Sequence, residues 1–207
     1  MKSVFDSQFQ HQFLAGNSGE KTVLALHGTG GTERDLVGLA QKLFPGASVL
    51  APRGNISERG AARFFARHAE GVFDLESLHH ETAKLASFVE DAAQNYGFDA
   101  ANVWALGFSN GANIAASLLL SHPHVLKGAV LLRAMTPFSP ERVPDLRGKS
   151  VFLASGQYDP IVEISDVAGL ADLLRNGGAD VKHEIVAADH GLVGHEIETI
   201  AEWVKAV

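Results

Sequence analysis

The chain contains no cysteine, and this absence excludes several kinds of chemistry. It can form no disulfide, no cysteine-ligated zinc site and no iron–sulfur cluster, and it offers no thiol nucleophile. Any nucleophile must therefore be an oxygen or a nitrogen atom.

The sequence also lacks long apolar runs and an excess of positive charge. No stretch approaches the roughly 18 consecutive apolar residues of a membrane span, and the N-terminal MKSVFD lacks the apolar run of a secretory signal. With 17 basic against 24 acidic residues, the formal net charge of −7 disfavours nucleic acid and anionic lipid surfaces. We therefore expect a cytoplasmic protein with no nucleic-acid partner and no membrane partner.

Short apolar runs rich in branched residues, each followed by glycine or a polar turn, are typical of buried parallel strands. Since 46% of the 207 residues are hydrophobic, the chain can form one sizeable core. We expect strands at Thr22–Leu26, Ser48–Ala51, Asn102–Leu106, Gly128–Leu132, Ser150–Ala154 and His183–Val186.

Between these strands lie segments whose apolar residues recur at intervals of three and four, which predicts helices. They are Asp35–Phe44, Leu75–Tyr96, Ala112–Ser121, Ile164–Arg175 and Glu196–Val204. The alternation predicts a single-domain α/β fold over residues 1–207, with a mostly parallel central sheet and helices on both faces. The segment Val4–Leu14 alternates loosely and is expected to form an edge strand or a hairpin, whereas Pro52–Phe73 shows no clean strand and only a possible short helix.

Gly107-Phe108-Ser109-Asn110-Gly111 matches the G-x-S-x-G pattern of a nucleophile elbow. It follows an expected strand and opens an expected helix, which is the setting that such an elbow requires. In so sharp a turn, side chains two positions before and after the serine would collide, and both positions are glycine. Ser109 is therefore the candidate nucleophile.

A serine hydroxyl needs a neighbouring base, and in this fold the acid and the histidine follow the serine in that order. Asp159 and His190 each come directly after one of the last two expected strands. Because the carboxyl ends of parallel strands meet at one edge, we expect Ser109, Asp159 and His190 to form a catalytic triad. Asp189, which precedes His190, remains a second candidate for the acid.

The tetrahedral intermediate of such a reaction needs fixed hydrogen-bond donors. One is the backbone N–H of Asn110, and we expect Thr29 to supply the other, from the loop HGTGGT that begins at His27. The loop lacks the P-loop lysine and the last glycine of a dinucleotide fingerprint, so no nucleotide cofactor is expected and His27 is expected to brace the loop. Surface positions are favoured over metal binding for the other histidines, such as His79-His80, because no H-E-x-x-H motif or acidic cluster accompanies them.

Taken together, the motifs resemble those of the α/β-hydrolases, within them the phospholipase/carboxylesterase group related to acyl-protein thioesterases and dienelactone hydrolases. The matching segments are LHGTGGTE (26–33), APRG (51–54), RFF (63–65), FDL (73–75), GFSNGANIA (107–115), LLRAM (131–135), SGQYDP (155–160) and DHGL (189–192). The resemblance implies Ser109 as nucleophile, Asp159 as acid, His190 as base, and Thr29 with Asn110 as oxyanion donors. The chain carries Asn110 where the thioesterases usually have glutamine, and Ser109 where dienelactone hydrolases use cysteine.

These residues predict a serine carboxylesterase that needs no metal or organic cofactor and cleaves small, soluble ester molecules through an acyl-enzyme. The short connection from Arg133 to Ser150 leaves no room for a lid domain, which disfavours long triglycerides. Thioesterase or lysophospholipase-type cleavage by the same serine, and ligand binding without turnover, remain alternatives. The sequence also leaves a homodimer open.

The segment Pro52–Phe73 is rich in arginine and leaves the sheet at the edge where the triad is expected. In one interpretation Arg59, Arg63 and Arg67 form a solvated helical face paired with Glu58 and Glu70. In the other, Arg63 or Arg67, with or without Arg133, faces the pocket and favours anionic esters, because a guanidinium binds a carboxylate with two hydrogen bonds. Arg63, Arg67, Arg133 and Met135 are accordingly the candidate substrate-binding residues.

Overall fold

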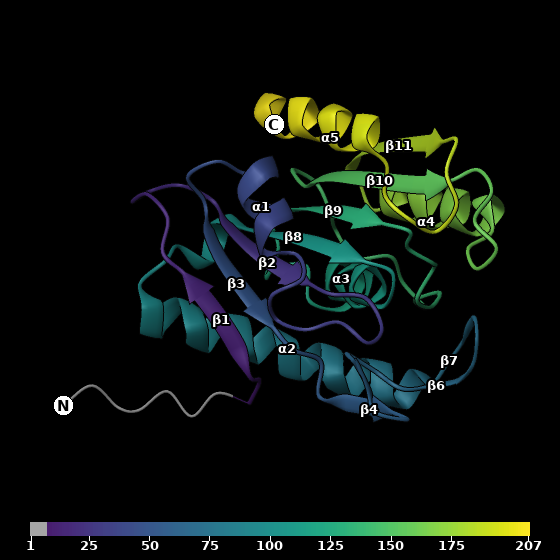
Figure 1. The fold of residues 1–207 in the computed structure, drawn as a ribbon, viewed down its shortest axis with the longest axis horizontal. Coiled ribbons are helices and arrows are strands. Elements are labelled where there is room, and N and C mark those ends of the chain that lie inside the picture. The colour runs from purple at the N-terminus through teal and green to yellow at the C-terminus, as the bar shows by residue number, and fades with distance from the viewer. Residues whose placement is uncertain (1–7) are drawn as a thin grey trace.

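The computed structural model describes residues 8–207, which form an α/β fold around a seven-stranded sheet of order β1-β3-β2-β8-β9-β10-β11 (Figure 1). Strand β1 pairs antiparallel with β3, and every other neighbouring pair in this sheet is parallel. The strands are β1 (His11–Leu14), β2 (Thr22–Leu26), β3 (Ser48–Pro52), β8 (Val103–Phe108), β9 (Gly128–Leu132), β10 (Ser150–Gly156) and β11 (Asp180–Val186).

Helices cover both faces of the sheet (Figure 1). They are α1 (Val37–Leu43), α2 (Leu75–Tyr96), α3 (Asn110–Ser121), α4 (Ile164–Asn176) and α5 (Gly194–Ala206). Helices α1 and α5 pack on one face, and α2, α3 and α4 pack on the other. This arrangement leaves the carboxyl ends of the parallel strands free to carry a site.

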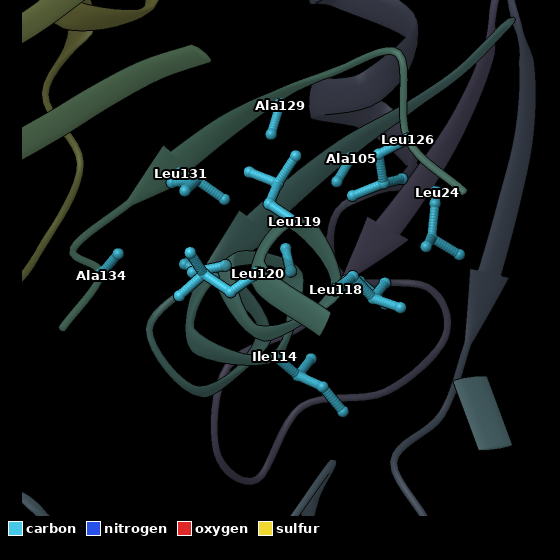
Figure 2. Close-up of a cluster of buried hydrophobic side chains, with 14 of the residues drawn as sticks. Leu24, Ala105, Ile114, Leu118, Leu119, Leu120, Leu126, Ala129, Leu131 and Ala134 are labelled. Atoms are coloured by element: carbon cyan, nitrogen blue, oxygen red, sulfur yellow. The ribbon is translucent and has the colours of Figure 1, made fainter. Parts of the chain in front are cut away.

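Successive residues of each central strand enter opposite cores because side chains alternate across a strand. In β2, Leu24 and Leu26 join the core beneath α2 and α3, whereas Val23 and Ala25 join the core beneath α1 and α5. Figure 2 shows the first of these cores, where leucines and Ile114 of α3 lie against small and branched side chains of the sheet. Burial on both faces explains why these strands are continuous apolar runs.

The expected strands and helices are present, with ends that differ by up to three residues from those predicted. The N-terminal segment contributes the antiparallel edge strand β1, whose His11 lies opposite Pro52 of β3. The part of that prediction that concerns residues 4–7 lies outside the described residues. No helix in the stretch from residue 8 to residue 207 has the length and apolar character needed to cross a bilayer.

The structure contradicts the prediction for Pro52–Phe73, because the segment contains four short strands and the possible short helix does not form. The segment folds instead as two hairpins, β4 (Ile56–Glu58) with β5 (Ala61–Arg63) and β6 (Arg67–Ala69) with β7 (Val72–Phe73). Arg59 and Gly60 both have positive φ, 52° and 89°, and form the two-residue turn that favours a hairpin. Arg59, Arg63 and Arg67 therefore do not share a helical face.

Candidate active site

Ser109 lies in the tight turn between β8 and α3 and has a backbone φ of 52° and ψ of −116°. The residues two positions before and two positions after it must be glycine. A Cβ atom on Gly111 would lie 2.0 Å from the carbonyl oxygen of Leu26, and one on Gly107 would lie 2.6 Å from the carbonyl oxygen of Gly111. The Ser109 N–H donates to the carbonyl oxygen of Leu132 at 2.8 Å, which fixes the turn to the end of β9.

Ser109, His190 and Asp159 are joined by hydrogen bonds at the carboxyl edge of the sheet. The distance from Ser109 Oγ to His190 Nε2 is 3.0 Å, and the distance from His190 Nδ1 to Asp159 Oδ2 is 2.8 Å. Since the carboxylate can only accept, Nδ1 carries the proton and Nε2 is left to accept from the serine hydroxyl. This is the geometry in which a histidine can remove the hydroxyl proton.

The Asp159 side chain is fully buried, and both of its oxygens are engaged. Oδ1 accepts hydrogen bonds from the backbone N–H groups of Ile161, at 2.8 Å, and Val162, at 3.1 Å. The rival acid is oriented differently, because Asp189 is exposed and its Oδ1 accepts from the N–H of Gly191 at 2.7 Å. The hydrogen-bonded partner of the His190 ring is thus Asp159.

The two expected oxyanion donors, Thr29 and Asn110, both line the cavity beside Ser109. Asn110 is the first residue of α3, so its N–H has no acceptor within the helix. Thr29 is held in place by Arg63, because its Oγ1 accepts a 2.6 Å hydrogen bond from Arg63 Nη1. The next residue, Gly30, donates its N–H to the carbonyl oxygen of Ala62 at 2.8 Å, which ties the loop to β5.

His27 joins the same loop to the segment after β3. Its Nε2 is 3.0 Å from the backbone nitrogen of Gly54, and its Nδ1 is 2.6 Å from the carbonyl oxygen of Gly28. An N–H can only donate, so Nε2 is the acceptor and Nδ1 carries the proton. Burial lowers the pKa of His27, which favours this neutral form.

The cavity beside Ser109 is walled by the two hairpins, by the first turn of α3 and by the segments after β9 and β10. Its lining residues are Thr29, Arg63, Arg67, Glu70, Phe73, Ser109, Asn110, Asn113, Arg133, Met135, Ile161 and Val162. Five lining residues were not among the predicted site residues: Glu70, Phe73, Asn113, Ile161 and Val162. Asn113 lies one helical turn after Asn110, and this spacing is the signal that could have identified it.

The arginines of the cavity wall are matched by carboxylates. Arg67 Nε lies 3.0 Å from one oxygen of Glu58, and Arg67 Nη1 lies 2.5 Å from Glu70. Arg63 is buried, and its Nη1 lies 3.6 Å from Glu58. The pairing with Glu58 and Glu70 agrees with one part of the first interpretation, but Arg63 is buried rather than solvated. Arg63 and Arg67 also both line the cavity, as the second interpretation expects.

Arg133 does not present its guanidinium to a substrate. Its side chain is fully buried and forms an ion pair with Glu196, with 2.6 Å between Nη1 and Oε1. The expectation that Arg133 binds an anionic ester is therefore wrong, because its buried guanidinium is already paired with the Glu196 carboxylate. Within residues 8–207, no three histidine or acidic side chains are grouped so that they could hold a metal ion.

Comparison with known families and proteins agrees with this architecture. The family model described as Phospholipase/Carboxylesterase matches residues 15–207. MhqD of Bacillus subtilis (strain 168), a hydrolase by name, is 41% identical over 196 residues, which are 95% of this chain and 98% of MhqD.

Two solved structures are closely similar. The Bacillus cereus carboxylesterase superposes with a TM-score of 0.95 and 44% identity, covering 97% of this chain and 95% of that chain. YahD, whose structure was determined with malic acid, has a TM-score of 0.90 and 30% identity, with coverage of 94% and 97%.

Proposed function

The chain belongs to the phospholipase/carboxylesterase family and is a hydrolase of the carboxylesterase kind, and on this premise we propose that it cleaves small, soluble carboxylic esters through Ser109, His190 and Asp159. The observation that carries the proposal is the pair of hydrogen bonds that connects the Ser109 hydroxyl through the His190 ring to the buried Asp159 carboxylate.

In the first half of the proposed reaction, Ser109 Oγ attacks the ester carbonyl carbon while His190 Nε2 takes the hydroxyl proton. Asp159 stabilises the imidazolium that results, and its hydrogen bond to Nδ1 keeps Nε2 directed at the serine. His190 then gives the proton to the alkoxide leaving group, and the acyl group remains on Ser109.

In the second half, water attacks the acyl-enzyme and His190 serves again as base and then as acid. Both tetrahedral intermediates place a negative charge on the former carbonyl oxygen. We assign its stabilisation to the backbone N–H groups of Thr29 and Asn110, two residues that line the cavity beside Ser109. Thr29, which carries the first donor, is fixed by its hydrogen bond from Arg63. Asn110, which carries the second, is fixed because it lies in the first turn of α3.

Small esters suit the site better than long-chain lipids. The connection between β9 and β10 contains no helix or strand, so no lid covers the cavity from that side. Although YahD was determined with malic acid, the cavity arginines here are paired with Glu58 and Glu70. We therefore propose no strong preference for anionic esters.

A fluorophosphonate probe tests the proposal, because it labels only an activated serine. Intact-mass analysis should show one adduct on the wild-type protein and none on Ser109→Ala. Ser121→Ala, at the exposed far end of the same helix, is the matched control and should label fully. A wild-type protein that binds esters but neither labels nor releases product would be a ligand-binding protein, and the hydrolase mechanism would be refuted. A panel of matched esters and thioesters then measures which acyl bond is preferred.

A further inference from the structure

The Arg133 guanidinium, at the end of β9, has all five of its N–H donors in use. Nη1 and Nη2 lie 2.6 Å and 3.0 Å from the two carboxylate oxygens of Glu196. Nη1 also donates to the carbonyl oxygen of Ala154 at 3.2 Å. The remaining two donors, one on Nε and one on Nη2, bind the carbonyl oxygens of Asp189, at 3.1 Å, and Gly191, at 2.6 Å.

Asp189 and Gly191 are the residues on either side of His190. The guanidinium thus holds the backbone on both sides of the histidine. Among residues 8–207, the ring itself forms hydrogen bonds only with Ser109 and Asp159. The residue before Arg133 has a complementary contact, because the carbonyl oxygen of Leu132 accepts from the N–H of Ser109. Two consecutive residues at the end of β9 therefore anchor the nucleophile and the base.

The cost of this arrangement argues that it serves more than stability. Arg133 is fully buried and Glu196 is 1% exposed, and a buried ion pair often stabilises a fold no better than apolar residues of the same volume. Arg133 also has a φ of 56°, which is unfavourable for a residue with a side chain. Both unfavourable features are tolerated in a position where the planar guanidinium lies between the end of β9 and the loop that carries His190.

We propose that Arg133 is a positioning residue that sets the orientation of His190 through the carbonyl groups of Asp189 and Gly191. The proposal rests on the proposed function, in which His190 is the base. Glu196 neutralises the guanidinium and fixes its plane, so that Nε and Nη2 point at the two carbonyl oxygens. A lysine could keep the charge, but a single ammonium group cannot span Glu196 and both carbonyl groups.

Two variants separate positioning from folding. Arg133→Lys retains the positive charge opposite Glu196 and loses the pair of hydrogen bonds to the carbonyl groups on either side of His190. The double variant Arg133→Met with Glu196→Leu removes both charges, and an apolar pair of this kind commonly preserves stability. If one of the two does not fold, the other still tests the proposal.

Val204→Ala is the matched control, because Val204 is a buried residue of α5, two helical turns beyond Glu196. It should lower the melting temperature and leave catalysis unchanged. In each variant we would measure kcat and KM with a small ester. We would also record the downfield NMR signal of the His190 Nδ1 proton, assigned by its loss in Asp159→Asn.

We expect kcat to fall about 10- to 100-fold in both Arg133 variants, because a misplacement of about 1 Å in a catalytic group has an effect of this size. KM should change less than about threefold, and the downfield signal should disappear or shift. A folded Arg133 variant with the kcat of Val204→Ala and an unchanged downfield signal would overturn the proposal. The NMR measurement needs no turnover, so it tests the positioning role even if the fluorophosphonate experiment refutes the hydrolase mechanism.

Discussion

Asn110 and Phe64, which are 46 positions apart, are joined by a 2.7 Å hydrogen bond from the Phe64 N–H to Asn110 Oδ1. One helical turn later, Asn113 Oδ1 accepts a hydrogen bond of the same length from the N–H of Met135. The first turn of α3 therefore attaches the hairpin wall on one side of the cavity and the segment after β9 on the other. The segment Pro52–Phe73 is thus attached to α3 at Phe64.

The first prediction concerns the proposed triad. Ser109→Ala and His190→Ala should each lower kcat by about 10⁶-fold, since either change removes the nucleophile–base pair. Asp159→Asn should cost about 10⁴-fold, because it leaves the base present in the wrong tautomer. Initial rates with a chromogenic ester measure these losses. Retention of most activity in purified Ser109→Ala would end the assignment.

A second prediction concerns the cavity arginines. Arg67 is balanced by Glu58 and Glu70, so Arg67→Ala should change kcat/KM by the same factor, within about threefold, for a neutral ester and its carboxylate-bearing analogue. Arg63→Ala should lower kcat for both substrates about equally, since Arg63 holds Thr29. A loss of 10-fold or more confined to the anionic ester would show instead that an arginine binds the substrate charge.

The elbow glycines give a third prediction. Gly111→Ala places a Cβ atom 2.0 Å from the Leu26 carbonyl oxygen and should destabilise the protein by about 3 kcal/mol or more. Gly169→Ala is the control, because Gly169 is exposed within α4 and its Cβ would meet no atom within 4 Å. That change should raise stability by about 0.5–1 kcal/mol through helix propensity. Urea unfolding of both variants measures the difference, and equal stabilities would contradict the packing argument.

The fourth prediction is a pH dependence of stability that arises from His27. Burial lowers its pKa below the ordinary value of 6.5, and protonation would prevent Nε2 from accepting the Gly54 N–H. As the pH falls below 6.5, the unfolded chain binds a proton that the folded chain does not, so stability decreases, by up to about 1.4 kcal/mol per pH unit for one histidine.

Burial also lowers the pKa of His122 and His183, so the wild-type slope sums several histidines. His27→Gln should reduce the slope of unfolding free energy against pH by the contribution of one histidine between pH 7.5 and about 5.5. Urea unfolding at a series of pH values measures this slope. An unchanged slope would show that His27 does not contribute to it.

The parallel core could be predicted from the sequence because burial on both faces leaves an unambiguous pattern. TVLAL at Thr22–Leu26 and GAVLL at Gly128–Leu132 begin and end where β2 and β9 do. The hairpins were missed because their strands are only two or three residues long, although the turns Arg59-Gly60 and Glu70-Gly71 are hairpin signals.

The candidate site, like the fold, could be predicted from the sequence only in part. Strand ends bring Ser109, Asp159 and His190 to one edge, a placement that topology alone predicts. The partner of Arg133 could not be predicted, because Glu196 is 63 residues away and only the packing of α5 on the sheet brings it near. The position of Arg133 directly after a buried strand does not indicate which carboxylate it pairs with.

The order of the strands along the chain has a consequence for synthesis. Ser109 follows β8, but Asp159 and His190 follow β10 and β11, and Glu196 begins α5. A chain growing from its N-terminus can form β1 to β9, including the Ser109 turn and the Leu132 carbonyl group that binds it, before the proposed base His190 has left the ribosome. The proposed nucleophile would then be in place before it could be activated, and the appearance of esterase activity would report that β11 and α5 have been translated and docked.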